Sequence, residues 1–152
     1  MKLLIGICVS ALLFLTNLVF ADGILSPRIP EKVKSECASC HMVYQPAFLP
    51  KESWARIMNG LDKHYGTDAS LDAQSIKEIS QWLNQNAGTY KRASSVPSND
   101  RITESAWFVK KHRKISDSIW RSDKVKSKSN CMACHVSADR GNYDDDDVRV
   151  PK

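Results

Sequence analysis

Two short stretches of the sequence carry the residues best suited to chemistry, and both follow the pattern C-x-x-C-H. Residues 37–41 read CASCH, and residues 131–135 read CMACH. Two cysteines three positions apart can form thioether bonds to the two vinyl groups of one heme, and the histidine that follows can reach the iron. We therefore predict two covalently bound heme c groups. The predicted thioether and iron-binding residues of the motifs are Cys37, Cys40, Cys131, Cys134, His41 and His135.

Other uses of paired cysteines explain these motifs less well. Disulfide bonds would account for the four cysteines of the two motifs in an exported chain, but they give no reason for a histidine after each pair. A four-cysteine zinc site usually joins two C-x-x-C units about 15–20 residues apart, and the two motifs here lie much farther apart. A thioredoxin-like pair requires a strand–turn–helix unit, and no strand-like run precedes either motif.

The two remaining histidines, His64 and His112, are the candidates for the second ligand of each iron. The chain has four histidines, which is the number that two six-coordinate hemes require. Each of the two closes or interrupts an apolar stripe with helical spacing, and a helix is predicted over each stripe, the first ending just before Gly66. The stripes are Trp54, Ile57, Met58, Leu61, His64 and Tyr65, and Phe108, His112, Ile115 and Ile119.

Two alternatives remain open for these positions. A histidine on an apolar face is ordinarily a hydrogen-bonded core residue, although covalent hemes in so small a protein make much of the buried surface porphyrin. Met58 shares the stripe of His64 and is the competing sixth ligand, with packing on the porphyrin as its other role. A carbonyl of the loop between Met42 and Pro50 is expected to accept the ring N–H of His41 and so fix its tautomer.

The first 21 residues, MKLLIGICVSALLFLTNLVFA, have the layout of a secretory signal peptide. A lysine precedes a long apolar run, and small Ala21 provides a cleavage site. The rival interpretation is an uncleaved membrane anchor, because the run approaches membrane-spanning length. We predict cleavage after Ala21, export to the periplasm, and a mature protein that does not span the membrane.

The order of the elements predicts a mainly α fold with two small heme-binding domains. The first, residues 22–90, has its motif early, then His64, then a closing helix with Ile76, Ile79, Trp82 and Leu83 on one face, which is the order of a class I cytochrome c. Residues 91–102 form a polar linker. The second domain, residues 103–152, is a short helical unit in which the distal histidine precedes the motif.

Each unit is too small for comfortable stability without a staple. The two covalently bound hemes would provide this stabilisation, and the tryptophans are expected to pack against the porphyrins as the walls of their sites. The tryptophans are Trp54, Trp82, Trp107 and Trp120.

Charge is unevenly distributed along a chain whose net charge is +5. Residues 101–128 hold nine basic and three acidic residues, whereas residues 22–90 hold seven and eight. The basic stretch is either a docking face for an acidic redox partner or a solvated face whose charges partly neutralise heme propionates. Nucleic acid is not an expected partner of an exported protein of this kind. The aspartates at 144–147 lack the alternating spacing of a calcium loop.

Longer runs around the motifs resemble a known family, the exported diheme cytochromes c called DHC. The similar runs are CASCHMVYQPAFLP, SWARIMNGLDKHYGTDASL, SNCMACH and GNYDDDDVRVP. The resemblance implies two domains, the first of class I type, and two histidines on each iron: His41 with His64, and His112 with His135. It also implies electron exchange with an oxygen-binding monoheme cytochrome c and a membrane b-type cytochrome. A pairing of histidines across the domains stays open.

These residues favour one-electron transfer over catalysis. Two imidazoles on each iron leave no open position for a substrate, and imidazole lacks the tendency of methionine to raise the potential. The alternative is a diheme enzyme of peroxidase or small-oxyanion reductase type, in which one distal histidine leaves its iron. A redox-sensing or scaffold module is a third possibility.

Overall fold

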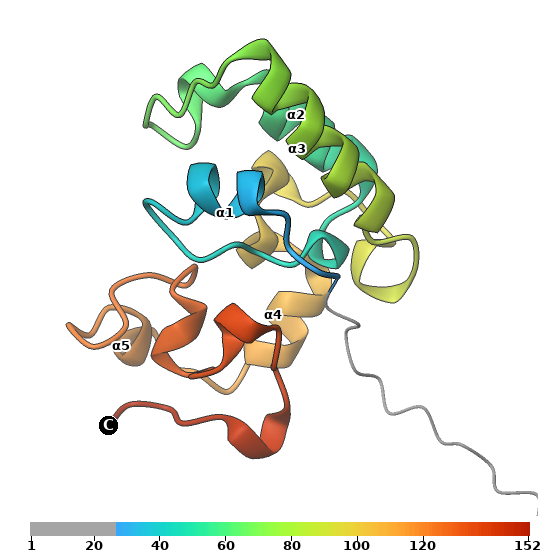
Figure 1. Ribbon diagram of the computed structural model, residues 1–152. Coiled ribbons are helices and arrows are strands. Elements are labelled where there is room, and N and C mark those ends of the chain that lie inside the picture. The colour runs from blue at the N-terminus through green and yellow to red at the C-terminus, as the bar shows by residue number, and fades with distance from the viewer. Residues whose placement is uncertain (1–26) are drawn as a thin grey trace, which may run out of the picture.

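The computed structural model describes residues 27–152, which fold into helices and turns (Figure 1). In this range the α-helices are α1 (Glu31–Cys37), α2 (Lys51–Asn59), α3 (Ala73–Asn86), α4 (Ala106–His112) and α5 (Asp117–Trp120). No strand forms among these residues, and the isolated bridges His64–Thr67 and His135–Val148 are the only β pairings. The predicted mainly α fold is confirmed.

Short 3₁₀ helices make up much of the rest of the chain. They are η1 (Pro46–Phe48), η2 (Leu61–Lys63), η3 (Lys91–Ala93), η4 (Ser98–Asp100), η5 (Ile102–Glu104), η6 (Cys131–Ala133), η7 (Ala138–Arg140) and η8 (Asp145–Asp147). The predicted signal peptide, residues 1–21, lies outside the described residues. Within residues 27–152, no helix is long and apolar enough to cross a membrane.

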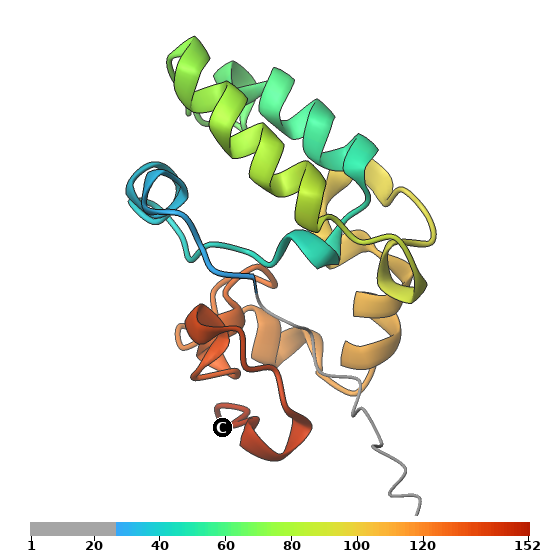
Figure 2. The same ribbon diagram turned by 45° about the vertical axis from the view of Figure 1, so that its right-hand side comes forward.

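Helices α2 and α3 lie side by side, and α1 packs against α3 (Figures 1 and 2). The carboxylate of Asp72 caps α3 by accepting hydrogen bonds from the backbone N–H groups of Gln74 and Ser75. The predicted apolar face of α3 is confirmed, because its large side chains are buried against α1 and α2. The core cluster is Val33, Leu49, Trp54, Met58, Leu61, Ile79, Trp82 and Leu83, with Ile76 partly buried against it.

The helix predicted to reach His64 is shorter than expected. Pro50 precedes its first turn as predicted, but α2 ends at Asn59, and Gly60 follows with φ −122° and ψ 31°. Glycine disfavours helix continuation because its backbone loses the most entropy when it is ordered. The chain tightens into η2, and His64 follows with ψ 90°, outside any helix.

The second predicted helix is also interrupted. Helix α4 ends at His112, and α5 begins only at Asp117. Ser116 has extended backbone angles and its hydroxyl accepts a hydrogen bond from the N–H of Ile119, so it starts a new helix instead of continuing the old one. Phe108 and His112 therefore share one helical face as predicted, whereas Ile115 lies in the break.

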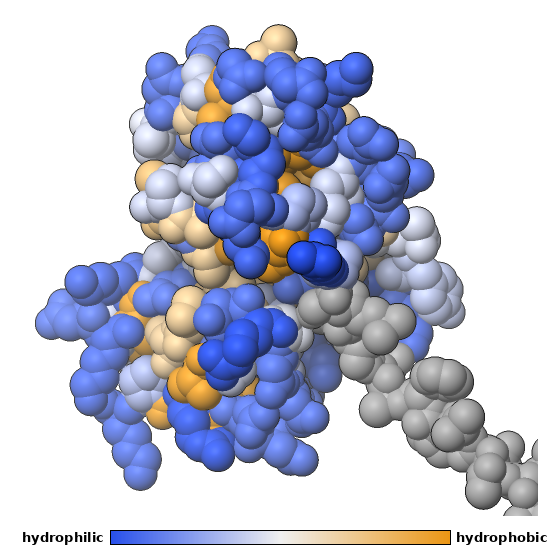
Figure 3. Space-filling model, viewed as in Figure 1, coloured by the Kyte–Doolittle hydropathy of each residue, from blue (hydrophilic) through white to orange (hydrophobic). Residues whose placement is uncertain are grey.

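The chain can be described as a first heme region (residues 27–90), a connecting segment (91–102) and a second heme region (103–152). The hydroxyl of Tyr44 donates to the carbonyl of Ser129 at 2.9 Å, and the indole N–H of Trp107 donates to the carbonyl of Phe48 at 3.4 Å. The division into two domains joined by a linker stays a prediction. On the face in Figure 3, hydrophobic residues form small patches among hydrophilic ones.

Candidate heme sites

All eight residues predicted to hold the hemes line one cavity of about 940 Å³. The cavity runs between the two heme regions, so residues nearly a hundred positions apart in sequence share its wall. Its lining includes the four tryptophans that the sequence predicts as porphyrin walls. The eight site residues are Cys37, Cys40, His41, His64, His112, Cys131, Cys134 and His135.

In the first heme region, the structure places His41 and His64 opposite each other. Their ring centroids lie 6.2 Å apart, and the ring planes differ by 25°. His41 follows the turn after α1, and its Nδ1 lies 2.6 Å from the carbonyl oxygen of Met42. The predicted carbonyl partner is therefore that of Met42, and Tyr44 stacks on the His41 ring at 4.9 Å.

In the second heme region, His112 and His135 face each other in the same way. Their centroids lie 6.1 Å apart, but their planes are inclined by 74°. His112 is the last residue of α4, and its Nδ1 lies 2.9 Å from the carbonyl oxygen of Phe108, one helical turn earlier. The carbonyl of Cys134 accepts a hydrogen bond from the N–H of Arg149, which ties the C-terminal segment to the second motif.

Both centroid separations leave room for one metal ion between two imidazole rings. A metal–imidazole bond is about 2.0–2.1 Å long, as for zinc, so two such bonds on opposite sides of one metal ion span about 4 Å. The distance from each bonded nitrogen to the centre of its ring adds to this span, and the two ring centroids then lie roughly 6 Å apart. The tautomers of His41 and His112 suit this role, because Nδ1–H donates to a backbone carbonyl and leaves Nε2 as the ligand. Met58 is buried and lines the cavity, but His64 is the residue opposite His41.

Burial changes the proton affinity of the site residues. It lowers the pKa of His64, and the neighbouring His41 and Arg101 lower it further. It also lowers the pKa of His135, where His112 adds to the shift and Asp145 opposes it. Both rings therefore favour the neutral form, which is the form that binds metal.

Burial favours the protonated thiol form of three motif cysteines. Burial raises the pKa of Cys37, with Glu36 adding to the shift, and raises the pKa of Cys131 to about 11. Burial also raises the pKa of Cys134. All four motif cysteines are free of disulfide bonds, so each sulfur is available for a thioether.

The cavity also fits a large apolar group with acidic edges. The Nδ1 of His135 and the hydroxyl of Tyr143 are buried without a hydrogen-bond partner among the described residues, and both side chains line the cavity. Cationic side chains also line the cavity and could pair with the propionates of a bound heme. They are Arg92, Arg101, Lys111 and Lys128.

The sequence analysis placed Tyr65 in the apolar stripe of His64 but predicted no contact between a tyrosine and a histidine ring. Tyr44 stacks on His41, the ring of Tyr65 meets His64 edge-on at 4.9 Å, and Tyr143 lies 5.5 Å from His135. Tyr65 adjoins His64 and Tyr44 follows His41 by three positions, so proximity in sequence was an available signal for these two. No comparable signal existed for Tyr143.

Comparisons with known proteins agree with this geometry. Residues 33–143 match the family model described as dihaem cytochrome c, DHC. The X-ray structure of a diheme cytochrome type c from Shewanella baltica, sb-DHC, is 36% identical with a TM-score of 0.70, over 81% of this chain and 95% of that one. DHC from Rhodobacter sphaeroides is 39% identical with a TM-score of 0.66, over 78% and 100% of the two chains. A comparison with curated protein sequences found no match.

Proposed function

Because the chain belongs to the dihaem cytochrome c family and carries two heme c groups, we propose that it is a periplasmic electron carrier with two histidines on each iron. Heme one is the group attached to Cys37 and Cys40, with His41 and His64 as ligands. Heme two is attached to Cys131 and Cys134, with His112 and His135 as ligands. The protein is then a carrier and not an enzyme.

The observation that carries this proposal is the pairing of the rings. Each motif histidine faces one distal histidine of its own region at about 6 Å, 6.2 Å in one pair and 6.1 Å in the other. This favours pairing within each region over pairing across the regions. A bound heme supplies a reversible one-electron couple at its iron, and two strong protein ligands leave no position for oxygen, peroxide or nitrite.

Carbon monoxide provides the direct test. The absorption spectrum of the dithionite-reduced holoprotein is expected to stay the same when carbon monoxide is added, because neither iron has a vacant or weakly held position. A carbon monoxide-shifted band in the wild-type protein would contradict the proposed ligation. It would favour the alternative, a diheme enzyme in which one distal histidine leaves its iron.

Electron paramagnetic resonance of the oxidised protein tests the ligation of each heme separately. When the two imidazole planes are near-parallel, the two iron d orbitals that interact with them differ in energy, and the low-spin signal is rhombic. When the planes are near-perpendicular, these two orbitals have almost equal energy, and the low-spin signal is strongly anisotropic. The inclinations of 25° and 74° therefore predict one signal of each kind in equal amounts. A high-spin signal would contradict two histidines on each iron, whereas two rhombic signals would contradict only the ring inclination of 74° between His112 and His135.

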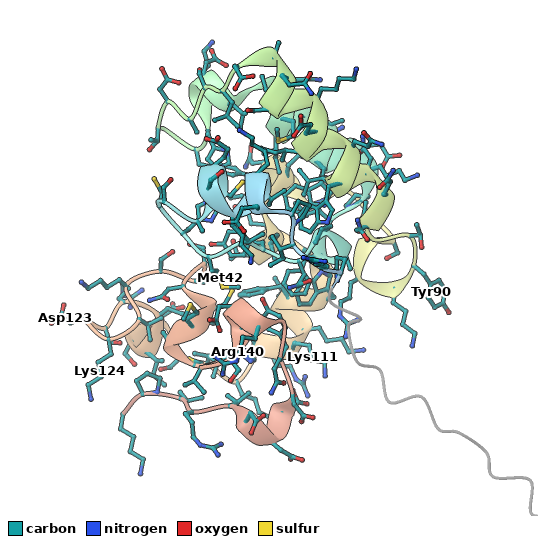
Figure 4. All side chains as sticks on the ribbon, viewed as in Figure 1. Met42, Tyr90, Lys111, Asp123, Lys124 and Arg140 are labelled. Atoms are coloured by element: carbon teal, nitrogen blue, oxygen red, sulfur yellow. The ribbon has the colours of Figure 1, made fainter. Side chains whose placement is uncertain are left out.

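The proposed partners are an oxygen-binding monoheme cytochrome c and a membrane b-type cytochrome. The support is the family resemblance together with the basic stretch at residues 101–128. Exposed cations of the second heme region, among them Lys111 and Lys124 (Figure 4), would steer an acidic partner toward that region. Stopped-flow rates of electron exchange with such a partner should then fall as ionic strength rises, and a rate independent of salt would contradict this docking face.

A further inference from the structure

The connecting segment folds back onto the part of the first heme region that carries His64. Arg56, on α2, donates two hydrogen bonds to the carboxylate of Asp100: Nε to Oδ2 at 2.9 Å and Nη2 to Oδ1 at 2.6 Å. The backbone carbonyl of Asp100 accepts a hydrogen bond from the hydroxyl of Tyr65 at 3.0 Å. One residue of the connecting segment thus binds both α2 and the residue next to the distal histidine.

Further contacts carry this connection to the heme ligand. The guanidinium group of Arg101 lies over the ring of Tyr65, 4.3 Å from its centroid. The Tyr65 ring in turn meets the His64 ring edge-on at 4.9 Å. We call these four residues, Arg56, Tyr65, Asp100 and Arg101, the latch.

The backbone of the latch is strained. Tyr65 has φ +50°, and the consecutive residues Asn99 and Asp100 have φ +51° and +54°. Asparagine and aspartate adopt such angles more readily than other non-glycine residues, so the strain is greatest at Tyr65, whose conformation persists only where the surroundings hold it. The two hydrogen bonds from Arg56 and the one from Tyr65 are interactions that can hold Asp100 there, because charge-assisted, bidentate bonds are the stronger kind.

His64 needs such external support more than His112 does. His112 ends an α-helix, and its ring nitrogen lies within hydrogen-bond distance of the carbonyl of Phe108 in the same helix. His64 lies outside any helix, after the short turn η2. The backbone of His64 itself makes two hydrogen bonds: its N–H donates to the carbonyl of Leu61, and its carbonyl accepts from the N–H of Thr67. The N–H of Ala69 also donates to the carbonyl of Leu61.

We propose that Asp100 and Arg56 are positioning residues that hold His64 against heme one through Tyr65. This inference rests on the proposed ligation of heme one by His64. Neither residue would touch the iron; they act by keeping the chain at Tyr65 in its strained conformation. When the latch is broken, the His64 ring leaves the iron more often, and heme one gains a position that an external ligand can take.

The test is the rate at which carbon monoxide combines with the reduced holoprotein carrying Asp100→Ala. Because the variant loses a bidentate, charge-assisted contact, carbon monoxide should combine with it at heme one only, whereas the wild type shows no binding under the same conditions. A His64→Gly variant supplies the reference spectrum of heme one with carbon monoxide bound. The matched control is Asp117→Ala, which removes an exposed ion pair to Arg121 in the second heme region (3.8 Å) and should leave the rate unchanged.

The outcomes separate this inference from the proposed function. Carbon monoxide binding at heme one by the wild-type protein would contradict the proposed ligation itself. An unreactive wild type with an equally unreactive Asp100→Ala variant would overturn the latch alone, including when that variant unfolds at a lower temperature. If Asp100→Ala does not yield folded holoprotein, Arg56→Gln removes the same contact from α2 and decides the question by the same criteria.

Discussion

The two heme regions hold the same kind of cofactor with different amounts of protein. The first has three α-helices and a core cluster of eight buried side chains. In the second, the α-helices are the short α4 and α5, and the buried hydrophobic residues are Phe108, Val125 and Ala138. A unit that buries so little surface needs further stabilisation, so heme two supplies much of the second region's core. The first region has a larger set of buried side chains, but all eight also line the heme cavity, so heme one contributes to that core as well.

The largest effect should come from preventing attachment of one heme at a time. Replacing both Cys131 and Cys134 by alanine should leave the second region without fixed structure, because the cavity walls then have no filling. Replacing Cys37 and Cys40 should leave the α2–α3 pair partly folded, because its buried side chains pack on one another as well as facing the cavity. Limited proteolysis with mass spectrometry would locate the cleavage sites, and a protected second region in the first variant would contradict the comparison.

The next effect tests whether the core of the first region carries its stability. Ile79 is 1% exposed in the middle of α3, and Ile79→Ala should lower the free energy of unfolding by about 3 kcal/mol through lost burial and a residual cavity. Val109→Ala, at a side chain that is 57% exposed, is the control and should change it by less than about 0.5 kcal/mol. Denaturant unfolding followed by circular dichroism measures the free energy of unfolding of both variants. A similar decrease in the two variants would contradict the view that the core of the first region carries its stability.

A close approach of the chain at Gly88 gives a smaller effect. A Cβ atom on Gly88 would lie 2.4 Å from the Cβ of Ala93 and 2.6 Å from the carbonyl oxygen of Ala47. Gly88→Ala should therefore cost about 2 kcal/mol by overpacking, because η1, which contains Ala47, must move.

The matched control for this variant is Gly60→Ala. There the nearest atom to a new Cβ is the carbonyl oxygen of Arg56 at 3.4 Å, an ordinary contact. Its unfolding free energy should change by less than about 1 kcal/mol. If thermal denaturation shows equal losses for the two variants, steric contact at Gly88 is not the cause.

Much of the fold and of the candidate site could be predicted from types and spacing of residues. The two C-x-x-C-H motifs predict six of the site residues directly. The presence of just two further histidines predicts His64 and His112 as the remaining iron ligands. The face of α3 follows from its apolar spacing, which the cap at Asp72 reinforces. These features depend on local sequence, so local rules recover them.

The remaining features depend on tertiary contacts. The apolar stripe around His64 continues past Gly60, but the helix ends before it. Periodicity indicates which side chains are buried, but it does not determine the backbone conformation that places them there. The link from Arg56 to Asp100 spans 44 positions, and residues 91–102 read as a plain polar linker. No pattern within either segment predicts that they meet.

The smallest effect concerns the hydrogen bond between the two regions. The hydroxyl of Tyr44 donates to the carbonyl of Ser129, two residues before Cys131, while the Tyr44 ring stacks on His41. Tyr44→Phe keeps the ring and removes this bond, so it should cost about 1 kcal/mol. Tyr90→Phe, at a residue that is 75% exposed, is the control and should change nothing measurable.

Hydrogen exchange of the holoprotein would show where the effect of Tyr44→Phe falls. If the second region depends on the first for support, backbone amides near Cys131 should exchange faster in the variant while those of α3 keep their protection. Equal acceleration in both regions would mean that they unfold as one unit. The two regions would then differ in how many side chains they bury but not in their stability toward unfolding.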